Sequence, residues 1–83
     1  MRFTLAGSEF DINPGDVPKK LQGIPPERVV THGVTLNGVL FPVKQVISCI
    51  TGLPKADFNS HQARQILRRM RFEVVTMNKA AGH

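Results

Sequence analysis

The sequence predicts a small α+β protein: a single winged-helix-like domain with a helix-turn-helix-like pair of helices, a β-hairpin wing and an N-terminal hairpin. Three observations predict this class. Eighty-three residues suffice for one domain with one modest core. The pair Asn37-Gly38 separates two runs of alternating apolar residues, which indicates a tight hairpin turn. Two segments after that turn repeat apolar residues at helical spacing.

We expect residues 1–83 to form one unit in three parts. Residues 1–41 contain the N-terminal hairpin, a short helix and the wing. Residues 42–75 contain the helix pair and a last strand, and residues 76–83 form a tail that frays from Asn78 to His83. The sequence has no internal repeat and no low-complexity tract that would suggest another organisation.

The first elements are expected to be a short hairpin and a short helix. Residues 3–5 and 9–12 alternate apolar and polar side chains, as strands do, around the turn-forming segment Ala6-Gly7-Ser8. The next residues, Asn13 to Asp16, break the strand and can cap a helix over about 16–22.

The second hairpin is the predicted wing. It pairs 29–36 with 39–41 across Asn37-Gly38, because both central residues of such a turn need positive φ and this pair adopts it at little cost. The alternation on both sides of the turn predicts one buried face, made of Val34, Leu36, Val39 and Phe41.

The first long helix is expected over 43–51. Pro42 suits its first helical position, and Gly52 suits its end. Its inner stripe is predicted to be Val43, Val46, Ile47 and Ile50. Cys49 is expected to be buried or half-buried. The positions expected to face solvent are Lys44, Gln45, Ser48 and Thr51.

The second long helix is expected over 60–70, with Asn59 or Ser60 as its cap. Its inner stripe repeats the same helical spacing, with Ala63, Ile66, Leu67 and Met70. Beyond it, a last strand is predicted to contain Phe72, Val74 and Val75.

Positive charge is concentrated in one part of the chain, whose net charge is +5 at pH 7. In residues 1–41 four basic and four acidic side chains cancel, and in residues 72–83 one of each cancels. Residues 42–71 carry six basic side chains and one acid, a net charge of +5. Such clustering is the electrostatic footprint of a protein that binds a polyanion. A basic face that only maintains solubility is the alternative.

The outer face of the second long helix carries the strongest functional signal, because it has no acidic residue. The helix dipole explains basic side chains only in the last turn, so it does not explain Arg64 near the middle. Arginine and glutamine are also the side chains that read guanine and adenine edges in the major groove. We therefore predict contacts with duplex DNA from the cap and outer positions of this helix: Asn59, Ser60, His61, Gln62, Arg64, Gln65, Arg68 and Arg69.

The preceding helix and the connector are expected to support that contact. In helix-turn-helix proteins the first helix and the turn lie across the phosphates. This role is predicted for Lys44 and Lys55, together with Ser48 and Thr51, and plain solvation is the alternative for the two lysines. The Asn37-Gly38 tip is the candidate wing contact.

No pattern in the sequence points to an enzyme, a metal site or a cofactor. His32 and His61 have no carboxylate or cysteine at ligand spacing, and Ser48-Cys49 shows no nucleophile signature. The chain has no Trp or Tyr to stack on the bases of single strands, which favours duplex DNA. It also has no run of roughly 18 apolar residues and no signal-peptide pattern, so we expect a cytoplasmic protein without a membrane partner. The sequence does not fix the oligomeric state.

Residues 32–75 contain short motifs that resemble a known module. That module lies at the N-terminus of actinobacterial HNH endonucleases of the McrA type, which are modification-dependent restriction enzymes. The resemblance implies a winged-helix-type DNA-binding fold that reads 5-methylcytosine in some members. The chain departs from it at Met70-Arg71, where the family usually has Leu-Gly, and no HNH nuclease follows, so we expect a free-standing reader or regulator. The motifs are His32-Gly33-Val34-Thr35-Leu36-Asn37-Gly38-Val39-Leu40-Phe41-Pro42-Val43-Lys44, Gly52-Leu53-Pro54, Asp57-Phe58-Asn59-Ser60, Ala63-Arg64 and Arg71-Phe72-Glu73-Val74.

A second interpretation keeps the basic helix and changes its partner. A protein-interaction module or small inhibitor would dock the same helix on an acidic protein. Salt-dependent binding to random DNA distinguishes the two. A small enzyme is a third class, but no acid–base or nucleophile pairing in the sequence supports it.

Overall fold

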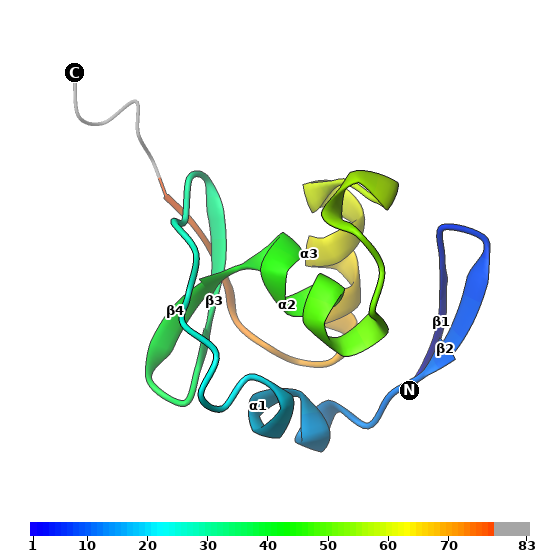
Figure 1. The fold of residues 1–83 in the computed structure, drawn as a ribbon, viewed down its shortest axis with the longest axis horizontal. Helices are drawn as coiled ribbons and strands as arrows, with labels where there is room; N and C mark the ends of the chain where they lie inside the picture. The colour runs from blue at the N-terminus through cyan, green and yellow to red at the C-terminus, as the bar shows by residue number, and fades with distance from the viewer. Residues whose placement is uncertain (78–83) are drawn as a thin grey trace.

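The computed structural model describes residues 1–77, which fold into a small α+β, winged-helix-like domain as the sequence predicts (Figure 1). The helices α2 and α3 lie between the β1–β2 hairpin on one side and the sheet containing β3 and β4 on the other. The predicted frayed tail, Asn78 to His83, lies outside the described residues. The elements are β1 (Arg2–Leu5), β2 (Ser8–Asp11), the 3-10 turn η1 (Pro14–Asp16), α1 (Val17–Lys20), β3 (His32–Leu36), β4 (Val39–Pro42), α2 (Val43–Thr51), the 3-10 turn η2 (Lys55–Asp57), α3 (Ser60–Arg69) and β5 (Val74–Thr76).

Both predicted hairpins are present, and they share one turn geometry. In the β1–β2 turn, Ala6 and Gly7 have φ angles of 53° and 77°. In the β3–β4 turn, Asn37 and Gly38 have φ angles of 55° and 76°. Positive φ at both central residues gives a turn whose twist matches that of the paired strands. Both strand pairs are antiparallel.

The strand β3 lies at the centre of a three-stranded antiparallel sheet with the order β4-β3-β5. On the face that the sequence predicts to be buried, Val34 lies opposite Phe41, and both are buried. Val39 is an exception, because it is 37% exposed. It lies opposite the buried Leu36, in the last pair before the turn.

The helix α2 differs from the prediction at its start and on its outer face. Pro42 is extended, with ψ 141°, so it is the N-cap and not the first helical residue. Gln45, predicted to face solvent, is only 8% exposed. Its Oε1 accepts a hydrogen bond from the Glu27 N–H at 2.8 Å, and its Nε2 donates one to the Pro25 carbonyl at 3.0 Å. This amide therefore ties the connector between α1 and β3 to the helix.

The helix α3 ends in a Schellman motif. The Arg71 N–H donates to the Arg68 carbonyl at 2.9 Å, and the Phe72 N–H donates to the Leu67 carbonyl at 3.0 Å. Arg71 has a φ of 70°, so it occupies the left-handed position that glycine usually fills. Phe72, predicted to belong to the last strand, instead precedes β5 and packs half-buried against the core.

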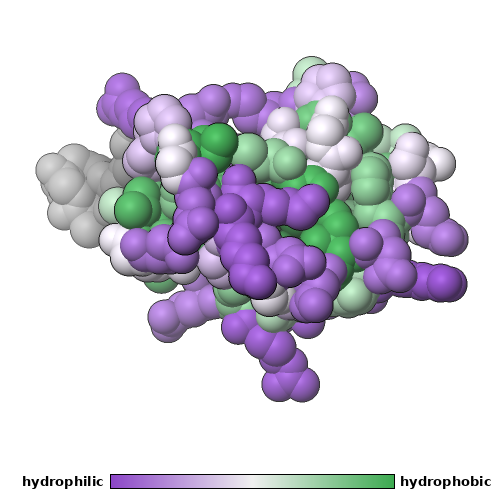
Figure 2. Space-filling model, turned by 60° about the horizontal axis from the view of Figure 1, so that its bottom comes forward, coloured by the Kyte–Doolittle hydropathy of each residue, from purple (hydrophilic) through white to green (hydrophobic). Residues whose placement is uncertain are grey.

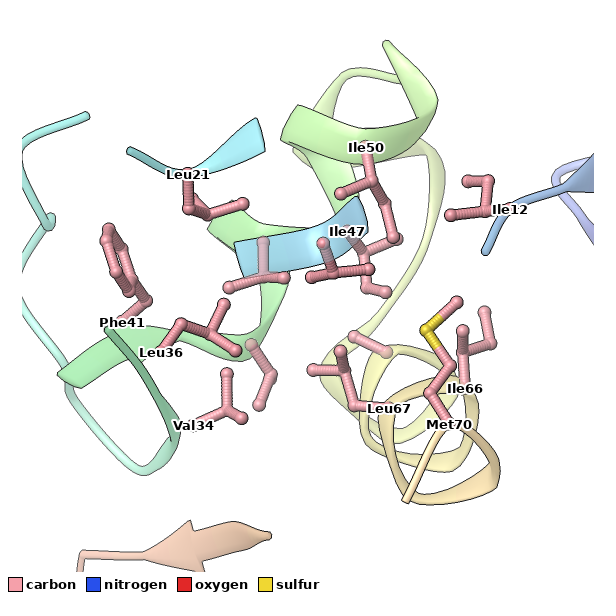
Figure 3. Close-up of a cluster of buried hydrophobic side chains, with 14 of the residues drawn as sticks. Ile12, Leu21, Val34, Leu36, Phe41, Ile47, Ile50, Ile66, Leu67 and Met70 are labelled. Carbon is pink, nitrogen blue, oxygen red and sulfur yellow. The ribbon is translucent and has the colours of Figure 1, made fainter. Parts of the chain in front are cut away.

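One hydrophobic core joins these elements. Figure 3 shows side chains from the β3–β4 hairpin, the end of α1, α2 and α3 converging on one cluster. Four of them, Leu21, Val34, Ile47 and Leu67, are at most 1% exposed. The predicted inner stripes of both long helices are confirmed, because all their members are buried: Val43, Val46, Ile47, Ile50, Ala63, Ile66, Leu67 and Met70.

The surface is mostly hydrophilic where Figure 2 shows it. On the face brought forward from below the view of Figure 1, hydrophilic side chains extend across the middle and separate smaller hydrophobic areas. Cys49, predicted to be buried or half-buried, is exposed, because α2 turns it away from its buried neighbour Ile50. Charge and hydrogen bonding therefore distinguish the faces of this molecule better than hydrophobicity does.

Candidate nucleic-acid interface

The helix α3 begins with a capping box. Asn59 Oδ1 accepts a hydrogen bond from the Gln62 N–H at 2.8 Å, and Gln62 Oε1 accepts one from the Asn59 N–H at 3.0 Å. Of the two predicted caps, Asn59 is the one used, and Ser60 is the first helical residue. Two predicted DNA-binding residues thus use their side-chain oxygens within the helix start, which leaves their amide NH₂ groups for a partner.

Three predicted site residues form a ridge along the outside of α3. A helix turns about 100° per residue, so His61, Gln65 and Arg68 share the face opposite the buried Ala63 and Ile66. All three ridge residues are exposed. None of them forms a side-chain hydrogen bond or an ion pair with another residue of the 1–77 range. We call these three residues the α3 ridge.

The β1–β2 hairpin borders one side of the ridge, as Figure 1 shows. A groove of about 440 Å³ separates them, with Thr4 and Leu5 on one wall and Gln65 and Arg69 on the other. Arg69 Nη2 also donates a hydrogen bond to the Arg2 carbonyl at 3.3 Å. Arg69, predicted to contact DNA, therefore also holds the hairpin beside α3.

Arg64 lies on the other side of the ridge. The sequence predicts an exposed side chain, but Arg64 is half-buried, and its Nε is enclosed without a hydrogen-bond partner among residues 1–77. Partial burial of His32 in β3, and then the positive charges of Arg64 and Arg68, lower the pKa of its imidazole. The His32 Nδ1 lies 3.2 Å from the Thr76 hydroxyl. The sequence analysis did not connect His32 with α3, because only the pairing of β3 in the sheet brings them together.

The two lysines predicted to contact phosphates lie in different environments. Lys44 Nζ lies 5.7 Å from the ring centroid of Phe58, and no carboxylate of the described residues lies within 4.0 Å of it. Lys55 Nζ forms an ion pair with Glu27. The sequence could not reveal this pair, because the partners are far apart along the chain. Lys44 remains a free cation in this part of the molecule, whereas the charge of Lys55 is balanced locally.

The hydroxyl groups predicted to assist the lysines are used within the chain. Ser48 Oγ donates a hydrogen bond to the Leu53 carbonyl at 2.6 Å. Thr51 Oγ1 donates one to the Ile47 carbonyl at 2.6 Å. Their bonds stabilise the end of α2 and the turn after it. The predicted supporting role therefore rests on Lys44.

The tip of the β3–β4 hairpin lies against α1. Asn37 Nδ2 donates a hydrogen bond to the Pro18 carbonyl at 2.8 Å, which holds the predicted wing tip there. The hairpin that borders α3 is β1–β2, whose residues Thr4 and Leu5 line the groove. The sequence identified both hairpins but not which of them lines this groove beside α3.

The described residues give no sign of a metal or membrane site. Within residues 1–77, no group of three or more His, Cys, Asp or Glu side chains could hold a metal ion. No helix in the same range is both long enough and apolar enough to cross a membrane.

The fold and this surface define a class: a small winged-helix-like α+β domain with an exposed ridge of basic and polar residues on one helix. A family model described as SCO5918-like matches residues 1–83, so the chain belongs to the SCO5918-like family. No curated protein and no solved structure matched the chain. The resemblance to the McrA-type module stays a prediction.

Proposed function

We propose that this protein binds duplex DNA by presenting the α3 ridge to the major groove. The ridge carries the proposal, because His61, Gln65 and Arg68 are exposed and make no side-chain bond within the described chain. The ten residues of α3 give a helix of about 15 Å. The major groove of B-DNA, about 12 Å wide, admits one helix.

The charges around the ridge support the same partner. Arg64, Arg68, Arg69 and Arg71 have no carboxylate within 4.0 Å in the range 1–77. Unpaired cations on one side of a small domain release condensed counterions when they meet phosphates, and this release supplies most of non-specific DNA affinity. The role proposed for the protein is therefore binding and not catalysis.

Within this arrangement the residues divide into two roles. Gln65 and Arg68 have the side chains that form paired hydrogen bonds with adenine and guanine edges. Ser60 and the amide groups of Asn59 and Gln62, at the N-terminus of α3, suit a backbone phosphate. A preference for 5-methylcytosine is implied only by the resemblance to the McrA-type module, and no residue of the α3 ridge supports it.

The test is a titration of a duplex of roughly two helical turns, methylated and unmethylated, followed by fluorescence anisotropy. The logarithm of the affinity should fall linearly with the logarithm of salt, with a slope of about −0.9 for each phosphate contacted. Three to five contacts are expected from the basic side chains, which is a slope of about −2.7 to −4.5. Tighter binding to the methylated duplex would support modification reading.

The alternative is a protein partner with an acidic surface. The same DNA titration distinguishes it from the DNA proposal. The α3 ridge would then dock on carboxylates, and random duplex DNA would bind weakly. An affinity for DNA that stays flat from about 50 to 200 mM salt would contradict the DNA proposal and favour an acidic protein.

A further inference from the structure

A second concave site lies beside α3, where the sheet meets the starts of two helices. It has a volume of about 260 Å³, and its lining comes from the segment before β3, from β3 itself, and from the first residues of α2 and α3. Figure 1 shows α2 starting directly from the sheet at this place. The polar lining includes Arg28, His32, Lys44 and Ser60, and the apolar lining includes Val30 and Val43. We call this site the sheet–helix pocket.

The pocket gathers positive charge that the described chain does not balance. Arg28 and Lys44 line it directly, and neither has a carboxylate within 4.0 Å among residues 1–77. Glu27, the acid next to Arg28 in the sequence, pairs with Lys55 instead. Arg64 lies close enough to His32, in the pocket wall, for its positive charge to contribute to the lowered pKa of the imidazole. Like charges held together without a counter-charge repel each other, so an anion entering the pocket would relieve this repulsion.

Hydrogen bonds within the chain hold parts of the pocket wall. Gln45 accepts one from the Glu27 N–H and donates one to the Pro25 carbonyl, and these bonds hold the segment that leads to Arg28. The contact between His32 Nδ1 and Thr76 leaves the other ring nitrogen of His32 for a partner. A pocket with fixed walls binds a ligand at a lower entropic cost than one that must form around it.

The apolar lining indicates what the anion carries with it. Val30, which lines the pocket, is 54% exposed, and Val43, which also lines it, is buried. A bare inorganic ion would make no use of these surfaces. A nucleotide would contact them, because its sugar places carbon atoms next to the phosphate.

We infer that the sheet–helix pocket binds one nucleotide phosphate, with Arg28, Lys44 and His32 on its oxygens and the sugar against Val30. The inference rests on the proposed function when the phosphate belongs to the backbone of a duplex lying along α3. A free nucleotide, which carries the phosphate as a monoester, could bind the pocket in the same way. The two sources are separated by experiment.

The first arm of the experiment uses thymidine 5′-monophosphate, with thymidine as the matched ligand that lacks only the phosphate. NMR titration at low salt should shift the signals of the His32 ring and the Lys44 amide with the monophosphate and not with thymidine. Lys44→Gln and Arg28→Gln should each weaken this binding by roughly threefold. Lys20→Gln, which removes an exposed charge from α1, should leave it unchanged.

The second arm uses the duplex. If a backbone phosphate enters the pocket, Lys44→Gln should reduce the magnitude of the salt slope by about 0.9, and Lys20→Gln should not. Binding of the monophosphate without binding of the duplex would support the pocket with a free nucleotide as its ligand and contradict the proposed function. Duplex binding that Lys44→Gln and Arg28→Gln leave unchanged, with no response to the monophosphate, would overturn the pocket and keep the proposed function. Failure of both probes to bind overturns both.

Discussion

The helices α2 and α3 bury similar apolar stripes but use their polar faces differently. On α2, the side chains of Gln45, Ser48 and Thr51 all form hydrogen bonds to the backbone of the same domain. On α3, the ridge residues form no such bond within residues 1–77. Apart from Lys44, the polar residues of α2 stabilise the fold, whereas the α3 ridge makes no side-chain bond among the described residues.

The difference comes from what crosses each helix. The connector before β3 passes over α2 at Gln45, and the chain after Gly52 returns past Ser48. The outside of α3 is bordered by the β1–β2 hairpin on one flank, across an open groove, and His32 of β3 lies near Arg64 on the other flank. Polar residues at helical spacing therefore do not by themselves indicate a binding surface. The folded structure must also show which chain segments pack over them.

The largest expected effect is on DNA binding and comes from the α3 ridge. Arg68→Ala should weaken duplex binding by about 1–3 kcal/mol and relax any sequence preference, because it removes a side chain that we propose contacts a base edge. Because Arg68 is exposed, the melting temperature should stay within about 2 °C of the original value. Anisotropy titration and thermal unfolding measure the two quantities.

The matched control for Arg68→Ala is Lys20→Ala, which removes one exposed charge from the half of the chain whose charges cancel. It should change duplex affinity only slightly. Equal losses in the two variants would mean that the protein has a general basic surface without a recognition helix. Arg64→Ala is less suitable, because Arg64 is half-buried and its loss changes packing as well as charge.

The next largest effect is on the free energy of unfolding, and it compares a glutamine on α2 with a glutamine on α3. Gln45→Ala should lower the free energy of unfolding by about 1–2 kcal/mol, because it leaves the Glu27 N–H and the Pro25 carbonyl without their partner. Gln65→Ala, on the ridge, should change it by less than about 0.5 kcal/mol. Denaturant unfolding monitored by circular dichroism compares the two. Similar changes would contradict the assignment of a structural α2 face and a free α3 face.

Local sequence signals were sufficient for most of the fold. The Asn37-Gly38 pair and the apolar spacing of the two helices concern residues close in the chain, so the sequence could place the wing and both buried stripes. The same holds for the cap of α3, where Asn59 and Gln62 are three residues apart. Local chemistry decides each of these features.

The candidate site was less predictable, because its details depend on residues distant in the sequence. The pairing of Lys55 with Glu27 balances the charge of a predicted phosphate contact, and the closeness of His32 to Arg64 adds a neighbour to α3. Neither follows from spacing, since the connector and the sheet bring these partners together only in the folded chain. Which hairpin borders α3 depends on packing in the same way.

The smallest expected effect concerns how the two helices end. Both are followed by a residue in the left-handed region, Gly52 with φ 79° after α2 and Arg71 with φ 70° after α3. A side chain with a Cβ is strained there and glycine is not, although glycine gives the unfolded chain more freedom. Arg71→Gly should therefore raise the free energy of unfolding by about 0.5–1 kcal/mol, even though it removes an exposed side chain.

The reverse change tests the same argument at α2. A Cβ added to Gly52 would meet no atom within 4 Å, so the effect of Gly52→Ala comes from the backbone alone. This variant should lose about 1 kcal/mol of stability, and its sign should be opposite to that of Arg71→Gly. Denaturant unfolding of both variants gives the comparison. If Arg71→Gly is destabilising, either the freedom of glycine in the unfolded chain or a stabilising contact of the Arg71 side chain outweighs the relief of backbone strain. In the second case the end of α3 would be held by that side chain, as Gln45, Ser48 and Thr51 hold α2, and the contrast between the two helices would be confined to the ridge.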